Sequence, residues 1–502
     1  KFLTGMDEHG EKVAEAAAKH NMTPQEWTDS QAPHFKELWN KLEISNDDFI
    51  RTTEPRQHHA VQYLWERMKE SGYLYKGSYD GWYCVPDETY FTDTQVQKGD
   101  EEYGSVGQHL CPDCHRPLER VQEESYFFKL SAFQDKLLKL YDEHPDFVEP
   151  AFRMNEVRSF VEGGLNDLSV SRTSFDWGIQ VPFDEGHVTY VWFDALLNYM
   201  TAVGYGVDTD EARAELAYRW PAQFHIVGKD IIRFHTIYWP IFLMALGEPL
   251  PKQVFGHPWL LVGDGKMSKS LGNVIYADDL VRLFGVDAIR YYVLHEMPFA
   301  NDGVLSYELI CERINSDLAN VLGNLVNRTI AMTKKYFGGI VPAPTAPEAL
   351  DDELKAVALG LPAAVEKKMD TLHVADAIDE VFALLRRSNK YIDETMPWAL
   401  AKDESKQARL GTVLYNLLEA IRFAAVELKP YLPDTADKIF AQLGVENKGV
   451  ESLTSFDGMQ PGQPVGEASI LFERIDIPKK LAEIEEEKKT AEAEQKPAVE
   501  FL

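Results

Sequence analysis

The sequence has 502 residues, of which 45% are hydrophobic and 12% aromatic, and this predicts two to four globular domains with sizeable cores. The formal net charge of −30 argues against a generic nucleic-acid binder, because attraction to phosphates supplies much of the affinity of such proteins. We find no apolar run of membrane-spanning length, no secretory leader and only four cysteines, so we expect a cytoplasmic protein without a membrane partner.

Strand-like and helix-like segments alternate over residues 1–79. Residues 2–5 resemble the end of a buried strand, and the turn Asp7-Glu8-His9-Gly10 leads into a helix expected to reach about residue 20. Residues 29–31 are expected to cap a second helix, which is followed by a strand at 49–53 and a helix at 58–69. This alternation predicts an α/β fold with a doubly wound, parallel, Rossmann-like sheet that binds ligands at the carboxyl ends of its strands.

Residues 80–165 do not continue this alternation of strands and helices, and they are predicted to form an inserted connective domain. Cys84 and Asp87 form a Cys-x-x-Asp pair, and Cys111 and Cys114 form a Cys-x-x-Cys pair further along the chain. Two such knuckles can close a tetrahedral zinc site, although here a carboxylate replaces one of the usual sulfurs. The sequence leaves open both a structural Zn²⁺ and an empty knuckle. Cys311, alone on a predicted helix, is expected to be a buried small hydrophobe.

Alternation resumes over residues 166–262, the predicted second half of the catalytic domain. Residues 188–199 cross from strand to helix, residues 224–230 form a short strand and turn, and a helix is expected at 231–246. The next region, residues 263–305, begins with a glycine-flanked loop that reads GDGKMSKSLG. In this loop Lys266 and Lys269 lie on either side of Ser268, a cationic arrangement suited to phosphate groups.

The remainder of the chain has a helical period. Apolar residues recur at spacings of three and four in stretches that begin at Ile314, Val374 and Leu410. Several amphipathic helices with short connections predict a helix bundle over residues 306–475. Residues 476–502 are rich in Lys, Glu and Ala, and we expect a charged linker or solvated helix there.

Four motifs follow one another in the chain: LTGMDEHG at residues 3–10, YVWFDALLNY at 190–199, VGKDIIRFH at 227–235 and KMSKS at 266–270. Together with NLVNR at 324–328 and Pro-Trp at 397–398, they resemble the bacterial-type methionyl-tRNA synthetases, which are class I aminoacyl-tRNA synthetases, over nearly the whole length. The family's first motif, His-Ile-Gly-His, does not occur in this sequence. We therefore expect that motif and a first strand upstream of Phe2 in a longer protein, and expect the 502-residue chain alone to be inactive or insoluble.

The resemblance implies a two-step reaction. Methionine and ATP form methionyl-adenylate and pyrophosphate, and the methionyl group then passes to the 3′-terminal ribose of tRNA(Met), including the initiator tRNA. The first step needs positioning and charge stabilisation rather than a general base, since the attacking carboxylate is already ionised. Lys266 and Lys269 would be the catalytic groups, and Mg²⁺ is expected to bridge the phosphates. The ATP-binding residues implied in this way are Gly228, Asp230, Lys266, Met267, Ser268, Lys269 and Ser270.

The same resemblance implies the other binding sites. Asp7 is set against the ammonium group of methionine, because a fixed carboxylate gives a charge-assisted hydrogen bond. The wall of the thioether pocket would consist of Trp192, Ala195, Leu196, Tyr199, Ile231 and His235. If the motifs are set aside, an ordinary place in the hydrophobic core is the alternative for Trp192, Tyr199 and His235. The anticodon would be read by Asn324, Arg328 and Trp398, for which a polar helix surface and a cap over the bundle are the alternatives. Local positive charge near them would come from Lys334, Lys335, Arg386, Arg387 and Lys390.

Three other interpretations compete. A ligase for leucine, isoleucine or valine would carry a much larger editing insertion than residues 80–165. A non-catalytic tRNA-binding paralogue would keep the fold without needing the lysine loop or the pocket residues. A zinc-knuckle RNA-binding module conflicts with the acidic charge and the single incomplete knuckle. The chain as given is expected to be a monomer, and a homodimer if a dimerising C-terminal domain follows it.

Overall fold

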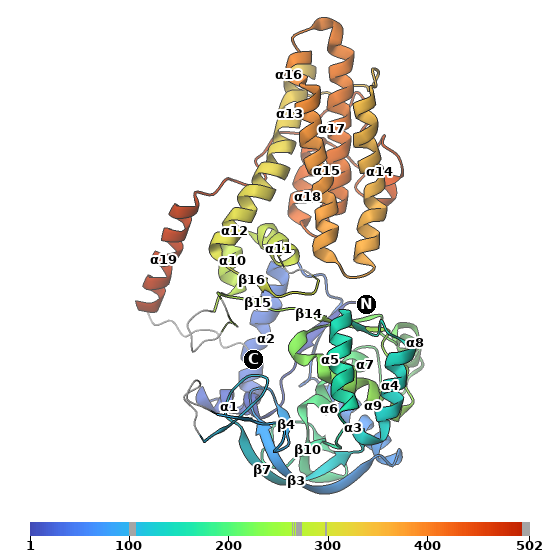
Figure 1. Ribbon diagram of the computed structural model, residues 1–502, viewed down its shortest axis with the longest axis vertical. Coiled ribbons are helices and arrows are strands. Elements are labelled where there is room, and N and C mark those ends of the chain that lie inside the picture. Colours follow the sequence, from blue (N-terminus) through green and yellow to red (C-terminus); the bar gives the residue numbers. More distant parts are fainter. Residues whose placement is uncertain (100–106, 264, 266, 268–273, 297–298, 494–502) are drawn as a thin grey trace. The chain divides into compact units, whose positions relative to one another are not determined.

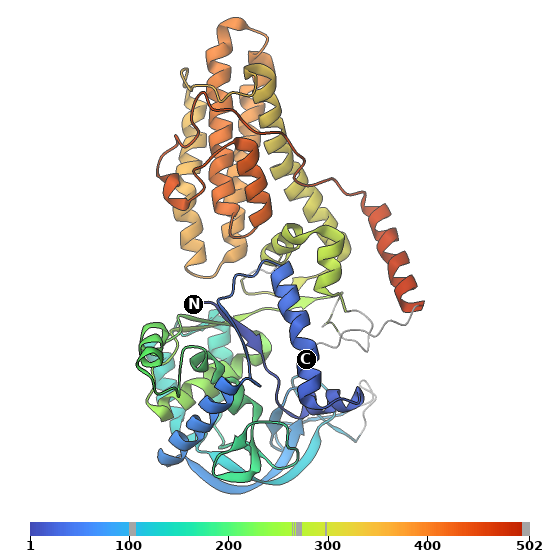
Figure 2. The same ribbon diagram turned by 180° about the vertical axis from the view of Figure 1, so that it is seen from behind.

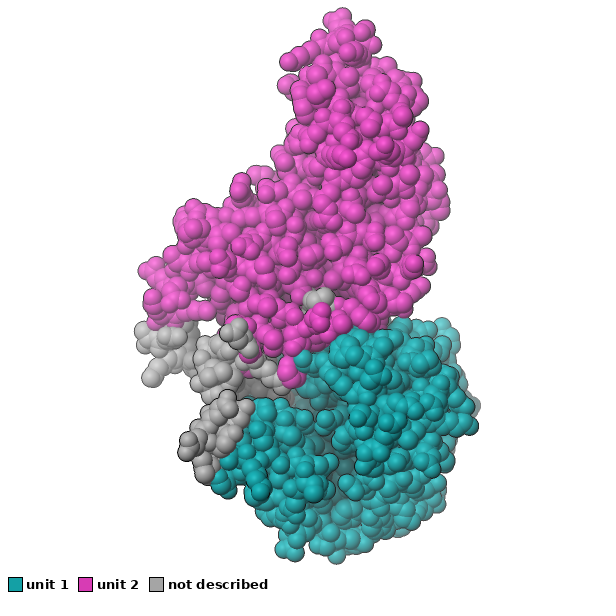
Figure 3. Space-filling view, viewed as in Figure 1, with its two compact units in different colours: residues 1–257, 499–502 teal, residues 258–498 magenta. Residues whose placement is uncertain are grey.

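The chain forms two compact units, residues 1–257 and residues 258–498, each with its own hydrophobic core (Figure 3). The structure, a computed structural model, describes residues 1–99, 107–263, 265, 267, 274–296 and 299–493 (Figure 1). The domain boundaries expected from the sequence are finer than this division and stay predictions. No helix among the described residues is long and apolar enough to cross a membrane.

Parallel strands form the framework of the first unit. Strand β1 (Leu3–Met6) pairs in parallel with β2 (Asp48–Arg51), and two helices, α1 (Glu11–Lys19) and α2 (Pro24–Lys41), connect them. A second parallel sheet has the order β13-β14-β8, formed by Phe224–Gly228, Gln253–His257 and Val148–Glu149. The α/β class with parallel strands is confirmed, and within the described residues these strands form two separate ladders rather than one sheet.

Helix α2 begins earlier than the sequence analysis predicted. Its cap is Thr23, whose hydroxyl accepts a hydrogen bond from the backbone N–H of Glu26, while the Glu26 carboxylate accepts one from the backbone N–H of Thr23. Pro24 then occupies the first helical position, where its missing N–H costs nothing. The expected cap at residues 29–31 was therefore wrong, because those residues lie inside the helix.

Helices cover the parallel strands and share one core with them. Helix α3 (Pro55–Glu70) buries one apolar face, in which Trp65 and Met68 are fully enclosed. The remaining helices of this unit are α4 (Gln134–Glu143), α5 (Ala151–Glu162), α6 (Val191–Ala195), α7 (Asn198–Thr201), α8 (Asp210–Arg219) and α9 (Trp239–Leu246). A short π-helix, η3 (Phe234–Tyr238), leads directly into α9.

The inserted segment is built on two long antiparallel strands, β3 (Leu74–Cys84) and β7 (Glu119–Phe128), which curve together along the first unit (Figures 1 and 2). Strand β4 (Thr89–Phe91) pairs with the far end of β3, and β9 (Leu168–Ser169) pairs with β7. The smaller antiparallel ladders join β5 (Gln97–Lys98) to β6 (His109–Leu110), and β12 (Asp184–Thr189) to β10 (Ser171–Arg172) and β11 (Gln180–Val181).

The second unit is mainly helical and confirms the predicted bundle. Helix α17 (Gln407–Leu428) is buried over nearly its whole length and packs against α13, α14, α15 and α18. Its charged residues Glu419 and Arg422 are both fully buried, and they pair at 2.7 Å, which satisfies charges that would otherwise be costly inside the core. The surrounding helices are α13 (Asn324–Phe337), α14 (Ala349–Met369), α15 (Val374–Thr395), α16 (Pro397–Leu400) and α18 (Pro433–Leu443).

A smaller region precedes the bundle in the chain. The parallel pair β15 (Leu260–Leu261) and β16 (Gly303–Val304) flanks α10 (Ala277–Phe284) and α11 (Val286–His295) in sequence. Helix α12 (Tyr307–Arg313) and the π-helix η5 (Ile314–Gly323) then lead into α13. The charged C-terminal segment forms α19 (Ile477–Ala493), and its Glu487 pairs with Arg282 of α10 at 2.9 Å. Helix α19 therefore contacts this region through at least one ion pair.

Candidate active site and metal centre

Two aspartates follow the carboxyl ends of parallel strands. Asp7 comes directly after β1, and Asp230 lies on the short 3-10 turn that follows Gly228, the last residue of β13. A Cβ at Gly228 would lie 2.4 Å from Asp230 Oδ1, so only glycine lets this carboxylate approach the end of the strand. Both aspartates are exposed to solvent. The resemblance assigned Asp7 to methionine binding and Asp230 to ATP binding.

Asp7 lies in an electrostatically unusual position. Its residue surface is accessible to solvent, yet protein surrounds it closely and the Asp194 carboxylate is near. Desolvation and this like charge raise the pKa of Asp7 to about 7. A carboxyl group held in this state gains most from a cationic partner, because a nearby ammonium would restore its charged form.

A buried pair that the sequence analysis did not identify supports Asp7. His9 Nδ1 lies 2.6 Å from Asp194 Oδ2, and both side chains are almost fully buried. Burial opposes protonation of His9, but the charge of Asp194 and its hydrogen bond outweigh this effect and raise the His9 pKa. Gln57 Nε2 donates to both the side chain and the backbone carbonyl of Asp194. The pair joins the LTGMDEHG segment to the YVWFDALLNY segment.

Aromatic and imidazole side chains from two motifs, YVWFDALLNY and VGKDIIRFH, meet one another. The Tyr199 hydroxyl lies 2.6 Å from His235 Nε2, and the Trp192 ring meets the His235 ring edge-on, with centroids 6.3 Å apart. Trp192 stacks on Phe234 at 3.8 Å, and its buried Nε1 has no hydrogen-bond partner within the described part of the chain. Burial is the main cause that raises the pKa of Tyr199, and the charge of Asp7 adds to it.

The π-helix η3 determines which tautomer His235 adopts. His235 Nδ1 lies 3.0 Å from the carbonyl oxygen of Ile231, one turn earlier, so Nδ1 carries the proton and donates to that oxygen. Nε2 is then free to accept the hydrogen bond from Tyr199. Burial lowers the pKa of His235 to about 4, so the ring is neutral at physiological pH.

The structure thus brings together four of the seven residues predicted for methionine, namely Trp192, Tyr199, Ile231 and His235, while Asp7 directly follows strand β1. The other two, Ala195 and Leu196, are buried at the end of helix α6 and immediately after it. No ligand contact tests any of these assignments, and all seven stay predictions.

The lysine loop lies largely outside the described residues, including Lys266, Ser268, Lys269 and Ser270. Its first residues form a tight turn in which Gly263 has φ 63° and the backbone N–H of Val262 donates to the carbonyl of Gly265 at 3.0 Å. Met267, assigned by resemblance to ATP binding, is partly buried and packs against the core of the second unit. The catalytic assignment of the two lysines remains a prediction from the motif.

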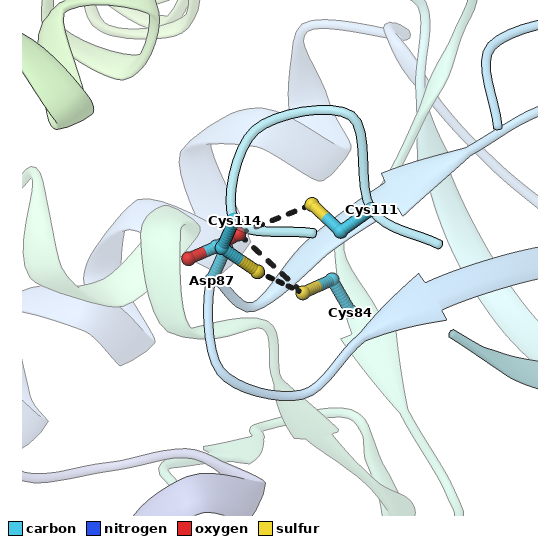
Figure 4. A group of neighbouring side chains, drawn as sticks. All are labelled: Cys84, Asp87, Cys111 and Cys114. Carbon is cyan, nitrogen blue, oxygen red and sulfur yellow. Dashed lines mark hydrogen bonds between the residues drawn. The ribbon is translucent and has the colours of Figure 1, made fainter. Parts of the chain in front are cut away.

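The knuckle residues converge on one point. The ligand atoms of Cys84, Asp87, Cys111 and Cys114 all lie within 4.8 Å of one another (Figure 4). Cys84 Sγ is 3.5 Å from Cys114 Sγ, and Asp87 Oδ2 is 3.2 Å from Cys111 Sγ. A tetrahedral Zn²⁺ with bonds of ~2.3 Å to sulfur sets two thiolates about 3.8 Å apart, so three sulfurs and one oxygen at this spacing fit a structural metal site.

The predicted anticodon residues occupy neighbouring levels of the bundle. Helices α13 and α15 run in the same direction (Figure 1), and Asn389 Nδ2 donates to the carbonyl of Val321 at 3.0 Å. Arg328 lies seven residues beyond Val321, and Met396 lies seven residues beyond Asn389. Each is therefore about 10 Å beyond this hydrogen bond along its own helix, and the two lie at a similar level. Trp398 follows on α16 and is 41% exposed, which leaves its ring accessible for stacking.

Asn324 and Arg328 share one face of α13 because they are four residues apart. Within the described residues neither side chain has a hydrogen-bond or ion-pair partner, so both can contact a ligand. By contrast, most of the predicted basic neighbours already pair with carboxylates, an arrangement that the local sequence did not indicate. These pairs join Lys334 to Glu467, Arg386 to Asp379, Arg387 to Glu353 and Glu394, and Lys390 to Glu394.

Comparison with known proteins places this geometry in a family. Residues 1–330 match the family model described as tRNA synthetases class I (M), and residues 341–489 match the anticodon binding domain of methionyl tRNA ligase. The chain is 51% identical over 501 residues to the methionine–tRNA ligase of Caldanaerobacter subterraneus subsp. tengcongensis, covering 98% of this chain and 76% of the relative. It is 52% identical to the enzyme of Clostridium perfringens, covering 96% and 73%.

A solved structure agrees with these relatives. The crystal structure of Mycobacterium tuberculosis methionyl-tRNA synthetase bound by methionyl-adenylate matches with a TM-score of 0.89 and 42% identity. The match covers 94% of this chain and 92% of that structure. Both family models, the relatives and the fold therefore agree, and the chain belongs to the methionyl-tRNA synthetases, a family of class I aminoacyl-tRNA synthetases.

Proposed function

We propose that this protein is a methionine–tRNA ligase that first forms methionyl-adenylate from methionine and ATP and then transfers methionine to tRNA(Met), including the initiator tRNA. The observations that carry the proposal are the meeting of the Trp192, Tyr199 and His235 side chains and the place of Asp7 at the carboxyl end of a parallel strand. Amino-acid-dependent ATP–pyrophosphate exchange on the full-length protein, run with all twenty amino acids, tests it. Exchange with methionine alone supports the proposal, and no exchange with any amino acid would favour a non-catalytic tRNA-binding paralogue.

Methionine recognition uses charge at one end and polarisable surface at the other. The Asp7 carboxylate binds the ammonium group, which leaves the carboxylate of methionine free to attack the α-phosphate. Trp192 and Tyr199 offer aromatic surface to the thioether, a contact worth about 0.3–1.5 kcal/mol. His235 adds no charge to this pocket, because burial keeps its ring neutral at physiological pH.

ATP is positioned by separate groups. Asp230, at the end of β13, is placed to accept hydrogen bonds from the ribose hydroxyls, while Gly228 lets the nucleotide approach the backbone. Lys266 and Lys269 neutralise charge that develops on the departing pyrophosphate. Mg²⁺, where it accompanies ATP, supplies further charge neutralisation at the phosphates.

The four knuckle residues suit a structural Zn²⁺, because a set of closed protein ligands leaves no open coordination position for chemistry. The proposal also places the protein in the cytoplasm, where its four cysteines, which are all free, persist as thiols. As in the sequence analysis, this chain would be a monomer, and a homodimer only through a further C-terminal domain.

Methionine binding is expected to depend on pH through Asp7. Only the ionised carboxylate pairs with the ammonium group, and the pKa of Asp7 in the free protein is about 7. The affinity should therefore rise as the pH increases from about 5.5 to 8, most steeply below pH 7 where it gains up to tenfold per unit, and then level off. Isothermal titration calorimetry across this range measures it. A flat profile in the wild type would contradict the role given to Asp7, and the same slope in Asp7→Asn would show that another group titrates.

Replacing the exposed tryptophan of the bundle should affect only the tRNA step. Trp398→Ala removes one stacking surface worth about 1–3 kcal/mol, so charging at limiting tRNA should fall roughly tenfold to a hundredfold. Pyrophosphate exchange without tRNA should be nearly unchanged, because the methionine and ATP residues belong to other parts of the chain. Tyr218→Ala, at an 81% exposed aromatic on α8, is the matched control. Equal loss in both assays with a lower melting temperature would identify Trp398 as a packing residue.

A further inference from the structure

The first knuckle turn ends at a residue with no role in the reaction described above. Glu88 directly follows Asp87 and has a left-handed backbone with φ 48°, and His115 directly follows Cys114 with φ 59°. The two turns thus share one backbone geometry, in which the residue after the second ligand leaves the turn in the left-handed conformation. The position of Glu88 is therefore set by the turn that carries two of the four metal-ligating atoms.

The side chain of Glu88 contacts the segment that carries Asp7. Helix α1 begins after Gly10, which has no side chain to cap it. A carboxyl group near this end of a helix is favoured by the partial positive charge of the helix N-terminus. A Cβ at Gly10 would lie 2.0 Å from Glu88 Oε1, so the carboxyl packs directly against this glycine. Glu88 therefore holds the end of the turn that begins at Asp7.

The backbone of Glu88 contacts the other wall of the methionine site. Its carbonyl oxygen accepts a hydrogen bond of 2.7 Å from the hydroxyl of Tyr190, which is 1% exposed. Tyr190 is the residue immediately before helix α6, the helix that carries Trp192 and Asp194. One residue of the knuckle thus holds both the Asp7 segment and the start of α6, and these two segments are joined directly by His9 and Asp194.

We propose that Glu88 is a positioning residue through which metal binding at the knuckle strengthens methionine binding. When Cys84 and Asp87 are tied to a metal ion, the turn is fixed, and Glu88 is held against α1 and Tyr190. Without the metal, the turn loses these restraints and both walls of the site lose a support. This inference rests on the proposed function, and coupling of this kind is reciprocal, so methionine should strengthen metal binding by the same factor.

The experiment compares methionine affinity with and without Zn²⁺ in the full-length protein. Zn²⁺ is removed with a chelator and restored as the simple ion, and methionine binding is followed by calorimetry. In the wild type, Zn²⁺ removal is expected to weaken methionine binding about fivefold or more. In Glu88→Ala, methionine binding should be weak in both states and respond less than twofold to Zn²⁺. Glu88→Gln keeps the size of the side chain that packs against Gly10 and should retain most of the response.

A matched control comes from the second turn. His115→Ala alters the equivalent backbone position, where the side chain bonds to Gln97 rather than to the methionine site, and it should respond to Zn²⁺ like the wild type. Zn²⁺ release, timed with a colorimetric chelator, should slow with saturating methionine in the wild type and His115→Ala but not in Glu88→Ala. An equal Zn²⁺ response in Glu88→Ala and the wild type, or no Zn²⁺ binding at all, would overturn the inference. A wild type that binds Zn²⁺ but not methionine would instead contradict the proposed function.

Discussion

Lys269→Ala is expected to slow adenylate formation by roughly 30-fold to 1000-fold, which corresponds to about 2–4 kcal/mol lost from the transition state. The reason is that the ammonium group of Lys269 meets the pyrophosphate mainly as negative charge builds on it. The loss should therefore fall on the rate constant for adenylate formation and leave the dissociation constant of methionine nearly unchanged. Single-turnover formation of adenylate, together with calorimetry for methionine, separates the two quantities.

The control for this substitution is Lys335→Ala, which removes one lysine from the surface of the bundle, where Lys335 lies over the ring of Tyr336. It should change neither measurement. If Lys269→Ala weakened methionine binding as much as it slowed the reaction, then the lysine would serve substrate binding or structure rather than the transition state.

Asp7→Asn is expected to weaken methionine binding by about 2–4 kcal/mol, or roughly 30-fold to 1000-fold. The substitution keeps the shape of the side chain but removes the charge opposite the ammonium group, which then lies in the site without a counter-ion. ATP binding should change little, because the residues proposed for it lie after β13 and in the lysine loop. Calorimetric titration with methionine, and separately with ATP, measures both effects.

Asp29→Asn is a suitable comparison, because Asp29 also pairs with a side chain of this region, Arg51, but lies on the surface of α2. It should bind methionine like the wild type. Asp7→Asn with normal methionine affinity would move the ammonium site elsewhere, and a loss accompanied by a lower unfolding temperature would assign Asp7 to stability.

The sequence predicted those parts of the site that are indicated by short motifs of neighbouring residues. A polar turn after a predicted strand indicated Asp7, whose role in binding stays a prediction. The spacing within each knuckle indicated Cys84, Asp87, Cys111 and Cys114, which the structure brings within reach of one metal ion. The family and its reaction followed from several short motifs in order. Each of these signals is contained within a few neighbouring residues.

Features that depend on distant partners were missed. His9 and Asp194 are 185 residues apart in sequence, and neither motif indicates that they pair. The ion pairs of the basic residues expected near the anticodon site also include a distant partner, since Arg387 pairs with Glu353 on another helix. The early start of α2 was different, because Thr23, Pro24 and Glu26 form a local capping signal that the sequence analysis did not use.

The π-helix at Phe234–Tyr238 also makes the number of residues in this stretch important. The carbonyls of Ile231 and Ile232 accept hydrogen bonds from the side chains of His235 and Thr236, at 3.0 and 2.7 Å. An insertion or deletion of one residue in an α-helix rotates everything beyond it by about 100°. A one-residue deletion here would close the π turn and swing His235 away from Tyr199, although no pocket residue had changed its identity. In this helix, the position of His235 therefore depends on the number of residues as well as on their identity.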